Sequence, residues 1–413
     1  MALDRNGMTL RPITADEVPM MARFIEGVFL SDYHDEDLEL DRSLVEPERT
    51  LAFFDGAAPV ASTAANTREL TVPGGPIPVA AVTAVAVAPT HRRRGLLATM
   101  MRRQLDELHE QQTEAVAILW ASEAGIYGRF GYGPACTANQ VSIANTETRI
   151  RPEVARGGRL LLRSGEDARP AMTAVYDQVR TARVGHLDRR GSWWDARTYD
   201  PVRRRDGASA LRYAVHTDDA GIADGYAIFN TKGRWDATGP KGELAIREVQ
   251  ATTPAGYAAV WSFLLEMDLI RTVTWDRASA DEPVRYLLDN PRAVQQTSVD
   301  SLWVRLVNVD RALAARTYAA PVDVVLEVAD PFCPWNAGRF RLTGDPSGAR
   351  CVCTTDEADL RLNVAALGAG YLGGTTLATL AAAGLVTEDR PGALAAASTA
   401  LSAQRPPACP EIF

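Results

Sequence analysis

The residues best suited to chemistry gather in one segment, where a valine-rich run is followed by a proline, three arginines and a glycine. The run ends at Pro89, and Arg92, Arg93 and Arg94 directly precede Gly95. A strand that leads through such a loop into a helix presents backbone N–H groups at the positive end of the helix dipole. Gly95 lets the backbone approach an anion closely, and the arginines add positive charge. The segment therefore predicts a binding site for a pyrophosphate.

The same letters also fit a solvated basic turn that caps a helix. The strand and proline before the loop, and the amphipathic helix after it, favour the anion site over that turn. The loop lacks the glycine spacing of a Rossmann fingerprint and the Walker lysine of a P-loop. It therefore indicates a pyrophosphate site of another class.

Buried strands and helices must surround this loop. The continuous apolar run that precedes it predicts a central strand, and Thr14 with Glu17 forms a capping-box pattern that opens an earlier helix. Strands and helices alternate through the first 145 residues. The expected elements are strands over 9–13, 51–54, 59–66, 79–88 and 115–121 and helices over 14–29, 95–110 and 126–130.

A second strand-helix unit follows in the middle of the chain. The segment Glu243–Leu265 corresponds to Val82–Met101, but its loop has no arginines, so we expect it to bind no pyrophosphate. From about residue 301 the pattern changes to strands followed by two Ala/Leu-rich helices, over 377–382 and 392–401. The tail from Arg405 to Phe413 holds three prolines and must be extended, so it is able to run back toward another domain.

Composition excludes several classes of protein. The chain has 413 residues and a net charge of −8, which argues against nucleic acid as a partner and is compatible with cationic substrates. Five sparse cysteines predict no disulfide scaffold, and Cys351 and Cys353, with no histidine within about a hundred residues, predict no metal site. The N-terminal residues show no signal-peptide pattern, and the longest apolar segment, 77–89, is too short for a membrane span. We therefore expect a cytoplasmic protein without metal, nucleic-acid or membrane partners.

Two segments together resemble a known family. The pattern V-x-V-x-P-x-x-R-R-R-G-L resembles the acetyl-CoA loop of the GCN5-related N-acetyltransferases, although Leu97 replaces the last small residue of the family pattern. With the segment Trp120–Pro134 it is similar to the Eis family (enhanced intracellular survival). The resemblance covers the whole chain and implies an α+β fold of two tandem acetyltransferase domains and a sterol-carrier-like domain. We expect their boundaries at 1–148, 149–300 and 301–413.

The resemblance also implies a set of site residues. Tyr127 matches the family's general acid, and the terminal carboxylate of Phe413 matches its general base. From the residues alone, Tyr127 and Tyr132 would equally be packing residues beside Phe130, and Phe413 a frayed end. The expected acetyl-CoA site is formed by Val85, Ala86, Val87, Arg92, Arg93, Arg94, Gly95, Leu96 and Ser122.

The acceptor is expected to be a polycationic amine. Five acids lie in the nine residues 31–39, and although such runs are usually solvated faces, acids bordering the acceptor site would attract a polycation. Candidate acceptor contacts are Glu26, Asp35, Glu36, Asp37, Ala84, Glu411 and Ile412. The resemblance implies direct acetyl transfer to aminoglycosides, as in antibiotic resistance, or to lysine side chains of peptides. It also implies a hexamer, a dimer of trimers.

One alternative changes the class of function. In it the C-terminal domain binds a lipid or a partner, and acetylation is vestigial. The intact Arg92–Gly95 loop speaks against this alternative.

Overall fold

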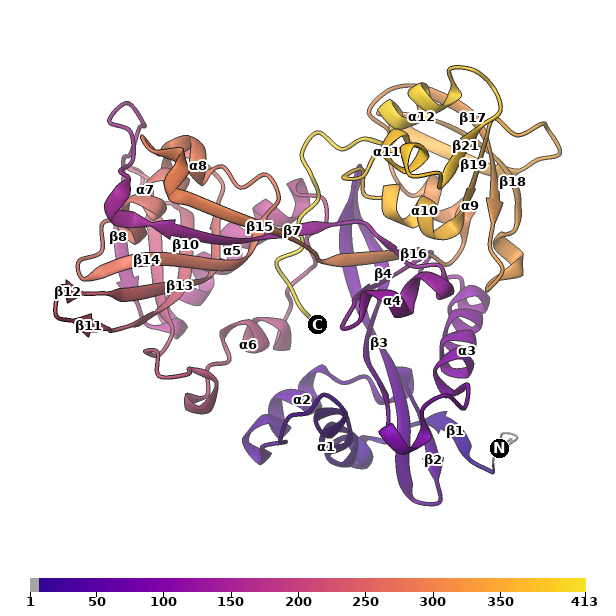
Figure 1. Ribbon diagram of the computed structural model, residues 1–413, viewed down its shortest axis with the longest axis horizontal. Helices are drawn as coiled ribbons and strands as arrows, with labels where there is room; N and C mark the ends of the chain where they lie inside the picture. Colours follow the sequence, from indigo (N-terminus) through magenta and orange to yellow (C-terminus); the bar gives the residue numbers. More distant parts are fainter. Residues whose placement is uncertain (1–6) are drawn as a thin grey trace.

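The first sheet is built around the long hairpin that the sequence places on either side of Pro73-Gly74. A computed structural model describes residues 7–413. The sheet has seven strands in the order β1-β2-β3-β4-β5-β16-β6 (Figure 1). These are β1 (Thr9–Pro12), β2 (Thr50–Asp55), β3 (Ala58–Val72), β4 (Gly75–Val87), β5 (Val116–Trp120), β16 (Leu302–Leu306) and β6 (Gly133–Pro134).

Helices flank this sheet, three of them close to where the sequence predicts them, whereas the helix over 38–44 was not predicted. The capping box is present, with Glu17 accepting the backbone N–H of Thr14, and it leads through a 3-10 turn into α1 (Val18–Val28). The others are α2 (Leu38–Leu44), α3 (Leu96–Gln111) and α4 (Ala124–Tyr127). On α3, Met100, Leu105 and Leu108 are buried, and its charged face points outward.

The second sheet also has seven strands, in the order β15-β7-β14-β13-β10-β9-β8. They are β15 (Val294–Asp300), β7 (Thr137–Ala144), β14 (Ile270–Ser279), β13 (Gly242–Ala251), β10 (Ala223–Lys232), β9 (Arg212–Thr217) and β8 (Arg159–Arg163). Its helices are α5 (Gly165–Ala182), α6 (Ser192–Thr198), α7 (Pro254–Leu265) and α8 (Val284–Leu287). A short hairpin of β11 (Trp235–Asp236) and β12 (Gly239–Pro240) stands apart from it.

The first two sheets exchange strands at two places, and there the structure differs from the expected division. β7 lies before residue 148 but pairs with β14 and β15 of the second sheet. Leu302–Leu306 lies after residue 300 but pairs with β5 of the first sheet. Both strands pair with segments more than a hundred residues away, which local patterns do not reveal. The three domain ranges otherwise stay a prediction.

The third sheet has the order β19-β18-β17-β20-β21. Its strands are β19 (Gly348–Cys353), β18 (Gly338–Asp345), β17 (Val322–Ala329), β20 (Leu360–Asn363) and β21 (Val386–Glu388). Its helices are α9 (Val309–Ala314), α10 (Val364–Gly370), α11 (Leu377–Ala382) and α12 (Ala393–Leu401). The two predicted Ala/Leu-rich helices are confirmed. One apolar cluster joins this part to β3, β4, β5 and β16.

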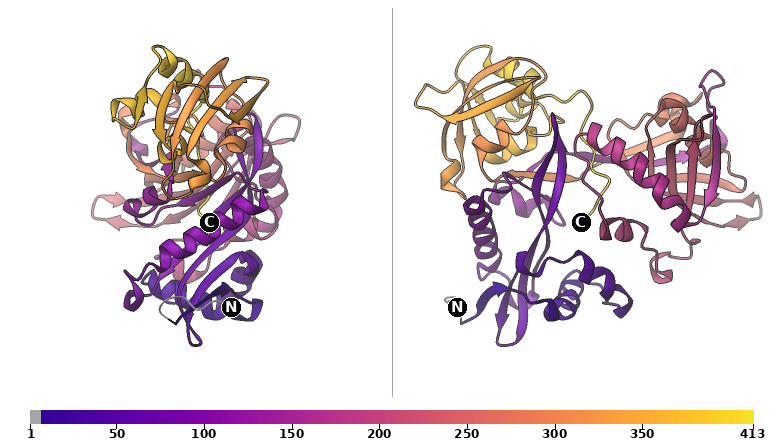
Figure 2. Two further views of the ribbon diagram at one scale, coloured as in Figure 1. Left: turned by 90° about the vertical axis from the view of Figure 1, so that its right-hand side faces the viewer. Right: turned by 180° about the vertical axis from the view of Figure 1, so that it is seen from behind.

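After α12 the chain runs without a helix or strand to Phe413. Figures 1 and 2 show that this tail leaves the C-terminal part and passes between the other two, ending near the middle of the molecule. The extended tail that the prolines predict is confirmed. Within residues 7–413 no helix is long and apolar enough to cross a membrane. Residues 1–6, part of the segment searched for a leader, lie outside the described residues.

Candidate active site

The predicted loop lies where two parallel strands of the first sheet separate. β4 pairs with β5 only from Ala80, opposite Ala117, to Val82, opposite Leu119. Ala84 then adopts a positive φ of +52°, and its carbonyl accepts the Ser62 hydroxyl at 2.7 Å. Such a bulge turns the strand away from its neighbour. The backbone of Val85–Val87 therefore borders an opening in the sheet.

The arginine loop closes one end of this opening. Arg93 and Gly95 have positive φ values of +63° and +82°, and α3 begins at Leu96. Arg92, Arg93 and Arg94 are exposed, and a Cβ at Gly95 would meet nothing within 4 Å. The structure thus brings together the residues predicted to hold acetyl-CoA on β4 and the helix start. The N-terminus of a four-turn helix and three guanidinium groups suit an anion.

Tyr127 and Ser122 lie beyond the end of β5, on the other side of the opening. Tyr127 is buried, and its ring meets Tyr132 edge-on with centroids 6.1 Å apart. Burial raises the pKa of its hydroxyl above the usual value, and the hydrogen bond with Ser122 partly offsets this rise. A phenol with a raised pKa keeps its proton at neutral pH, as a proton donor must.

The end of the tail reaches the same opening. An oxygen of Phe413 accepts a hydrogen bond from the Thr83 hydroxyl at 2.9 Å, one residue past the last paired position of β4. The Phe413 ring is half-buried against the shared apolar cluster. The structure therefore places a main-chain oxygen at the point where the strands part. Sequence reasoning did not single out Thr83, because a threonine within a strand carries no signal of its own.

The two candidate acceptor residues on the tail differ in their burial. Glu411 is buried, and Arg189 donates Nε–H to its carboxylate at 2.6 Å. Ile412 is exposed over 56% of its surface. Glu411 thus has a partner inside the protein that the sequence did not predict.

Three of the five acids in 31–39 are also paired with arginines, which differs from the open acidic wall that we expected. Asp35 bonds Arg23 at 2.7 Å, and Glu36 pairs with Arg203. Asp37 is buried and accepts bonds from Tyr199 and Arg203 of the second domain. The physical reason is the Val202–Arg204 turn, which brings arginines from a distant segment against this run. Glu26, on α1, is half-exposed and has no ion pair among the described residues.

The second domain repeats the strand-helix unit without the charges. β13 leads to α7, where the Thr253 hydroxyl accepts the backbone N–H of Gly256 at 3.0 Å. No arginine lies in this connection. That this unit binds no acetyl-CoA stays a prediction. In the described chain, no group of three or more His, Cys, Asp or Glu side chains is arranged to hold a metal ion.

Known proteins match this architecture in all three parts. Residues 9–135 and 185–306 each match a family described as an acetyltransferase (GNAT) domain. Residues 309–410 match the sterol carrier protein domain.

Relatives match over nearly the whole length. The chain is 45% identical over 382 residues to an N-acetyltransferase of Streptomyces avermitilis, covering 92% of each chain. It is 34% identical over 400 residues to the N-acetyltransferase Eis of Mycobacterium tuberculosis, covering 92% of this chain and 94% of that protein. The crystal structure of Eis1 from Mycobacterium abscessus matches with a TM-score of 0.82 at 32% identity, over 98% of this chain and 100% of that one.

The chain belongs to the Eis-like N-acetyltransferases. It is an N-acetyltransferase with two GNAT domains and a C-terminal sterol-carrier-like domain, as the resemblance implied. GNAT domains in general use acetyl-CoA as the acetyl donor, and an acetyltransferase moves the acetyl group from its donor to an acceptor.

Proposed function

We propose that this enzyme moves acetyl from acetyl-CoA directly to primary amines of a polycationic small molecule of the aminoglycoside kind. Acetyl-CoA would lie in the opening between β4 and β5, with Val85, Ala86 and Val87 along its pantetheine. Arg92, Arg93, Arg94, Gly95 and Leu96 would hold its pyrophosphate, and Ser122 would lie near the thioester. The observation that carries the proposal is the Phe413 oxygen at Thr83, 2.9 Å away, within the same opening.

The chemistry needs one acid and one base. The acceptor ammonium first gives a proton to the Phe413 carboxylate, directly or through a water. The free amine then attacks the acetyl carbonyl carbon, the C–N bond forms, and the C–S bond breaks. The departing thiolate takes the Tyr127 proton. Since both reactants are held together, orientation supplies much of the rate and no covalent enzyme intermediate is needed.

Charge supports a cationic acceptor. The net charge of −8 gives the enzyme an overall attraction for polyamines. Glu26 lies half-exposed on α1, which packs against β3 and β4 next to the opening. The paired acids Asp35, Glu36 and Asp37 support this proposal less than we expected, because arginines already neutralise them. Ala84 remains a candidate acceptor contact because it borders the opening, and Ile412 because it lies on the tail next to Phe413.

An acceptor panel tests the proposal. Acetyl-CoA-dependent thiol release is measured with aminoglycosides, linear polyamines and a lysine peptide. The masses of the products are measured by mass spectrometry. We expect release with the multi-amine cations. Release with the lysine peptide alone would replace the small-molecule acceptor by a protein. Failure to bind acetyl-CoA would overturn the assignment of Arg92–Leu96 and favour a lipid- or partner-binding role.

The proposal also extends to the assembly and the location that the family resemblance implies. We propose a hexamer built as a dimer of trimers, in the cytoplasm. Sedimentation velocity of the full chain measures the assembly directly, and a monomer would contradict this part of the proposal.

A further inference from the structure

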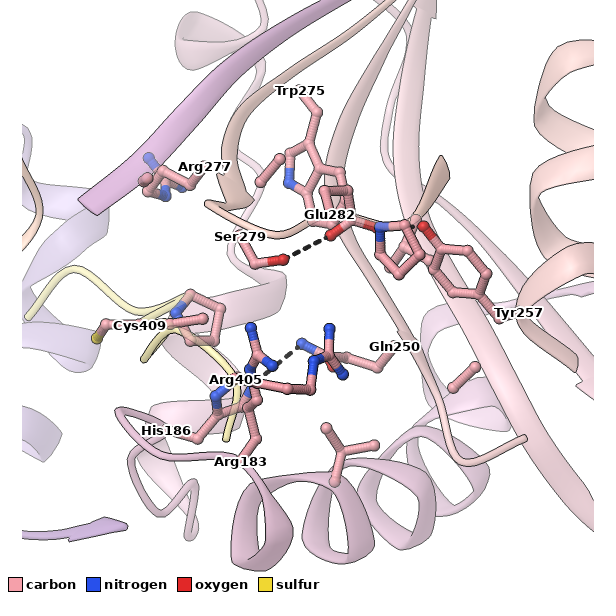
Figure 3. A pocket seen from close by; sticks show the side chains of 18 of the residues that line it. Arg183, His186, Gln250, Tyr257, Trp275, Arg277, Ser279, Glu282, Arg405 and Cys409 are labelled. Carbon is pink, nitrogen blue, oxygen red and sulfur yellow. Dashed lines mark hydrogen bonds between the residues drawn. The ribbon is translucent and has the colours of Figure 1, made fainter. Parts of the chain in front are cut away.

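The second sheet opens as the first does, and the C-terminal tail lies in that opening. β13 and β14 pair in parallel only from Gly242, opposite Ile270, to Ile246, opposite Trp275. The far parts of both strands and tail residues 408–410 line a cavity of about 130 Å³. Figure 3 shows Cys409 of the tail at one side of this cavity and Trp275 and Ser279 of β14 at another. The place that corresponds to the acetyl-CoA opening of the first domain is therefore bordered by the chain's own end.

Backbone contacts fix the path of the tail. The N–H of Ala408 donates to the Val184 carbonyl at 2.9 Å. Gly185, with φ of +93°, lies so close that a Cβ there would meet the Ala408 oxygen at 2.7 Å. Arg197 donates Nη1–H to the Pro410 carbonyl at 3.4 Å. These contacts all come from the second domain.

A buried ionic network then holds the side chain of Glu411, two residues before the last. Arg189 donates to Glu411 at 2.6 Å and makes two parallel bonds of 2.9 Å to Glu248. Arg197 pairs with the same Glu248 at 2.6 Å. The side chains of Arg189 and Glu248 are 0% exposed, that of Glu411 is 4% and that of Arg197 is 6%. Two buried cations face two buried carboxylates, so the charges balance only while Glu411 is in place.

Aromatic groups complete the setting of Arg189. Its guanidinium lies 3.8 Å from the centroid of the Tyr176 ring and 4.5 Å from that of Trp194. The Tyr176 hydroxyl donates to the Leu187 carbonyl at 2.9 Å and lies 3.4 Å from a carboxylate oxygen of Glu411. Arg189 is therefore held on several sides and offers Glu411 one fixed position.

We propose that Arg189 is a positioning residue for the C-terminal carboxylate, and that the second domain has become the holder of the catalytic tail. The proposal rests on the assignment of Phe413 as the general base. Phe413 follows Glu411 by two residues, a span of at most about 7 Å. Movement of Glu411 therefore passes directly to the carboxylate at Thr83. A displacement of about 1 Å in such a group costs about a hundredfold in rate.

The test compares Glu411→Gln with a matched control, Glu282→Gln. Both glutamates are buried at the second domain, 4% and 6% exposed, but Glu282 bonds Tyr257 and Ser279 and makes no hydrogen bond to the described tail. We expect Glu411→Gln to lower kcat about tenfold or more while KM for acetyl-CoA stays unchanged. Glu282→Gln should keep the wild-type kcat. Equal losses in both variants would mean a general structural effect and overturn the proposal.

Two further measurements separate positioning from the proposed base. In a chain lacking Phe413, Glu411→Gln should lower the residual kcat no further, because the group on which it acts is gone. Release of Phe413 by a carboxypeptidase should be faster from Glu411→Gln than from wild type, and this readout needs no turnover. If deletion of Phe413 leaves kcat at the wild-type value, the base assignment is wrong and the positioning role with it. If deletion abolishes turnover while Glu411→Gln keeps wild-type kcat and resistance, only the positioning role is wrong.

Discussion

Tyr127, the proposed general acid, shows how burial acts on a tyrosine hydroxyl. Its hydroxyl is buried enough for its pKa to rise, yet it bonds to Ser122 at the rim of the opening. Tyr132, which packs against it edge-on, is fully buried, and its hydroxyl has no hydrogen-bond partner among the described residues. Two neighbouring tyrosines thus differ in what their hydroxyl groups can do.

The difference predicts opposite results for the same substitution. Tyr127→Phe removes the proposed proton donor and keeps the packing, so kcat should fall about 10²–10⁴-fold with little change in acetyl-CoA affinity. Tyr132→Phe removes a hydroxyl without a partner and should leave kcat within about twofold. Steady-state kinetics of both variants measures this. A Tyr127→Phe enzyme with wild-type kcat would show that another group donates the proton.

His186 gives a prediction for stability against pH. Burial and the nearby Arg183 lower the pKa of its imidazole to about 3, with Arg189 also lowering it and Glu248 acting the other way. Below about pH 6.5 the imidazole is therefore protonated in the unfolded chain but stays neutral in the folded chain. The free energy of unfolding thus falls as pH drops from about 6.5 toward 3. His186→Gln should make this loss shallower by up to about 1.4 kcal/mol per pH unit. Unfolding midpoints measured from pH 4.5 to 7.5 compare the two slopes, and identical slopes would contradict a buried neutral imidazole.

At the scale of elements, the opening between β4 and β5 and the start of α3 form one unit. The bulge at Ala84 frees the strand, and Gly95 turns the chain so that the arginines lie at the helix N-terminus. Arg92 and Arg93 make no side-chain hydrogen bond or ion pair with the described residues, so their charge is available to a ligand.

We predict that removing the charges of this loop changes the affinity for acetyl-CoA only. Arg92→Gln with Arg93→Gln should weaken acetyl-CoA binding about tenfold or more, since each charge-assisted contact to phosphate contributes about 1.5–3 kcal/mol. Arg159→Gln with Arg163→Gln, two exposed arginines on β8, is the control for net charge. Calorimetry at two salt concentrations measures the affinity. Equal affinities in the loop variant and the control would place the pyrophosphate elsewhere.

Local patterns predicted most of these elements. The valine run of β4, the capping box at Thr14 and the Ala/Leu-rich α11 and α12 each follow from neighbouring residues. The exchange of β7 and β16 between the sheets did not, because it depends on pairing between distant segments. The bulge at Ala84 was also unpredicted, since alanine gives no sign of a positive φ.

At the scale of the whole molecule, arginine pairs join the first and second domains. Asp37 accepts bonds from Arg203 and from the Tyr199 hydroxyl, and Arg68 donates Nε–H to Asp188 at 3.0 Å. The sequence could not reveal these pairs. Forty-two of the 44 basic residues are arginine, so nothing local distinguishes Arg203 or Arg189 from the rest.

Asp37 therefore has a prediction that separates a structural from a substrate role. Asp37→Asn leaves Arg203 without its buried carboxylate and should lower the thermal midpoint by roughly 3–6 °C, with KM for the acceptor little changed. Asp35→Asn is the control, because the Asp35 side chain is 82% exposed and its pair with Arg23 contributes little. Differential scanning calorimetry and acceptor titrations give both readouts. A raised acceptor KM at an unchanged midpoint would restore Asp37 to the acceptor site.

The tail connects all three parts of the chain, and its chemistry is the central claim. Its prolines predicted an extended path, but only the network around Arg189 and the Thr83 hydroxyl show where that path ends. The most direct measurement appends a single glycine after Phe413, which keeps every side chain and moves the terminal carboxylate by about 3.5 Å. We predict a kcat at least about a hundredfold lower, with acetyl-CoA affinity unchanged. An extended enzyme that turns over at the wild-type rate would contradict the role of the Phe413 carboxylate as the base.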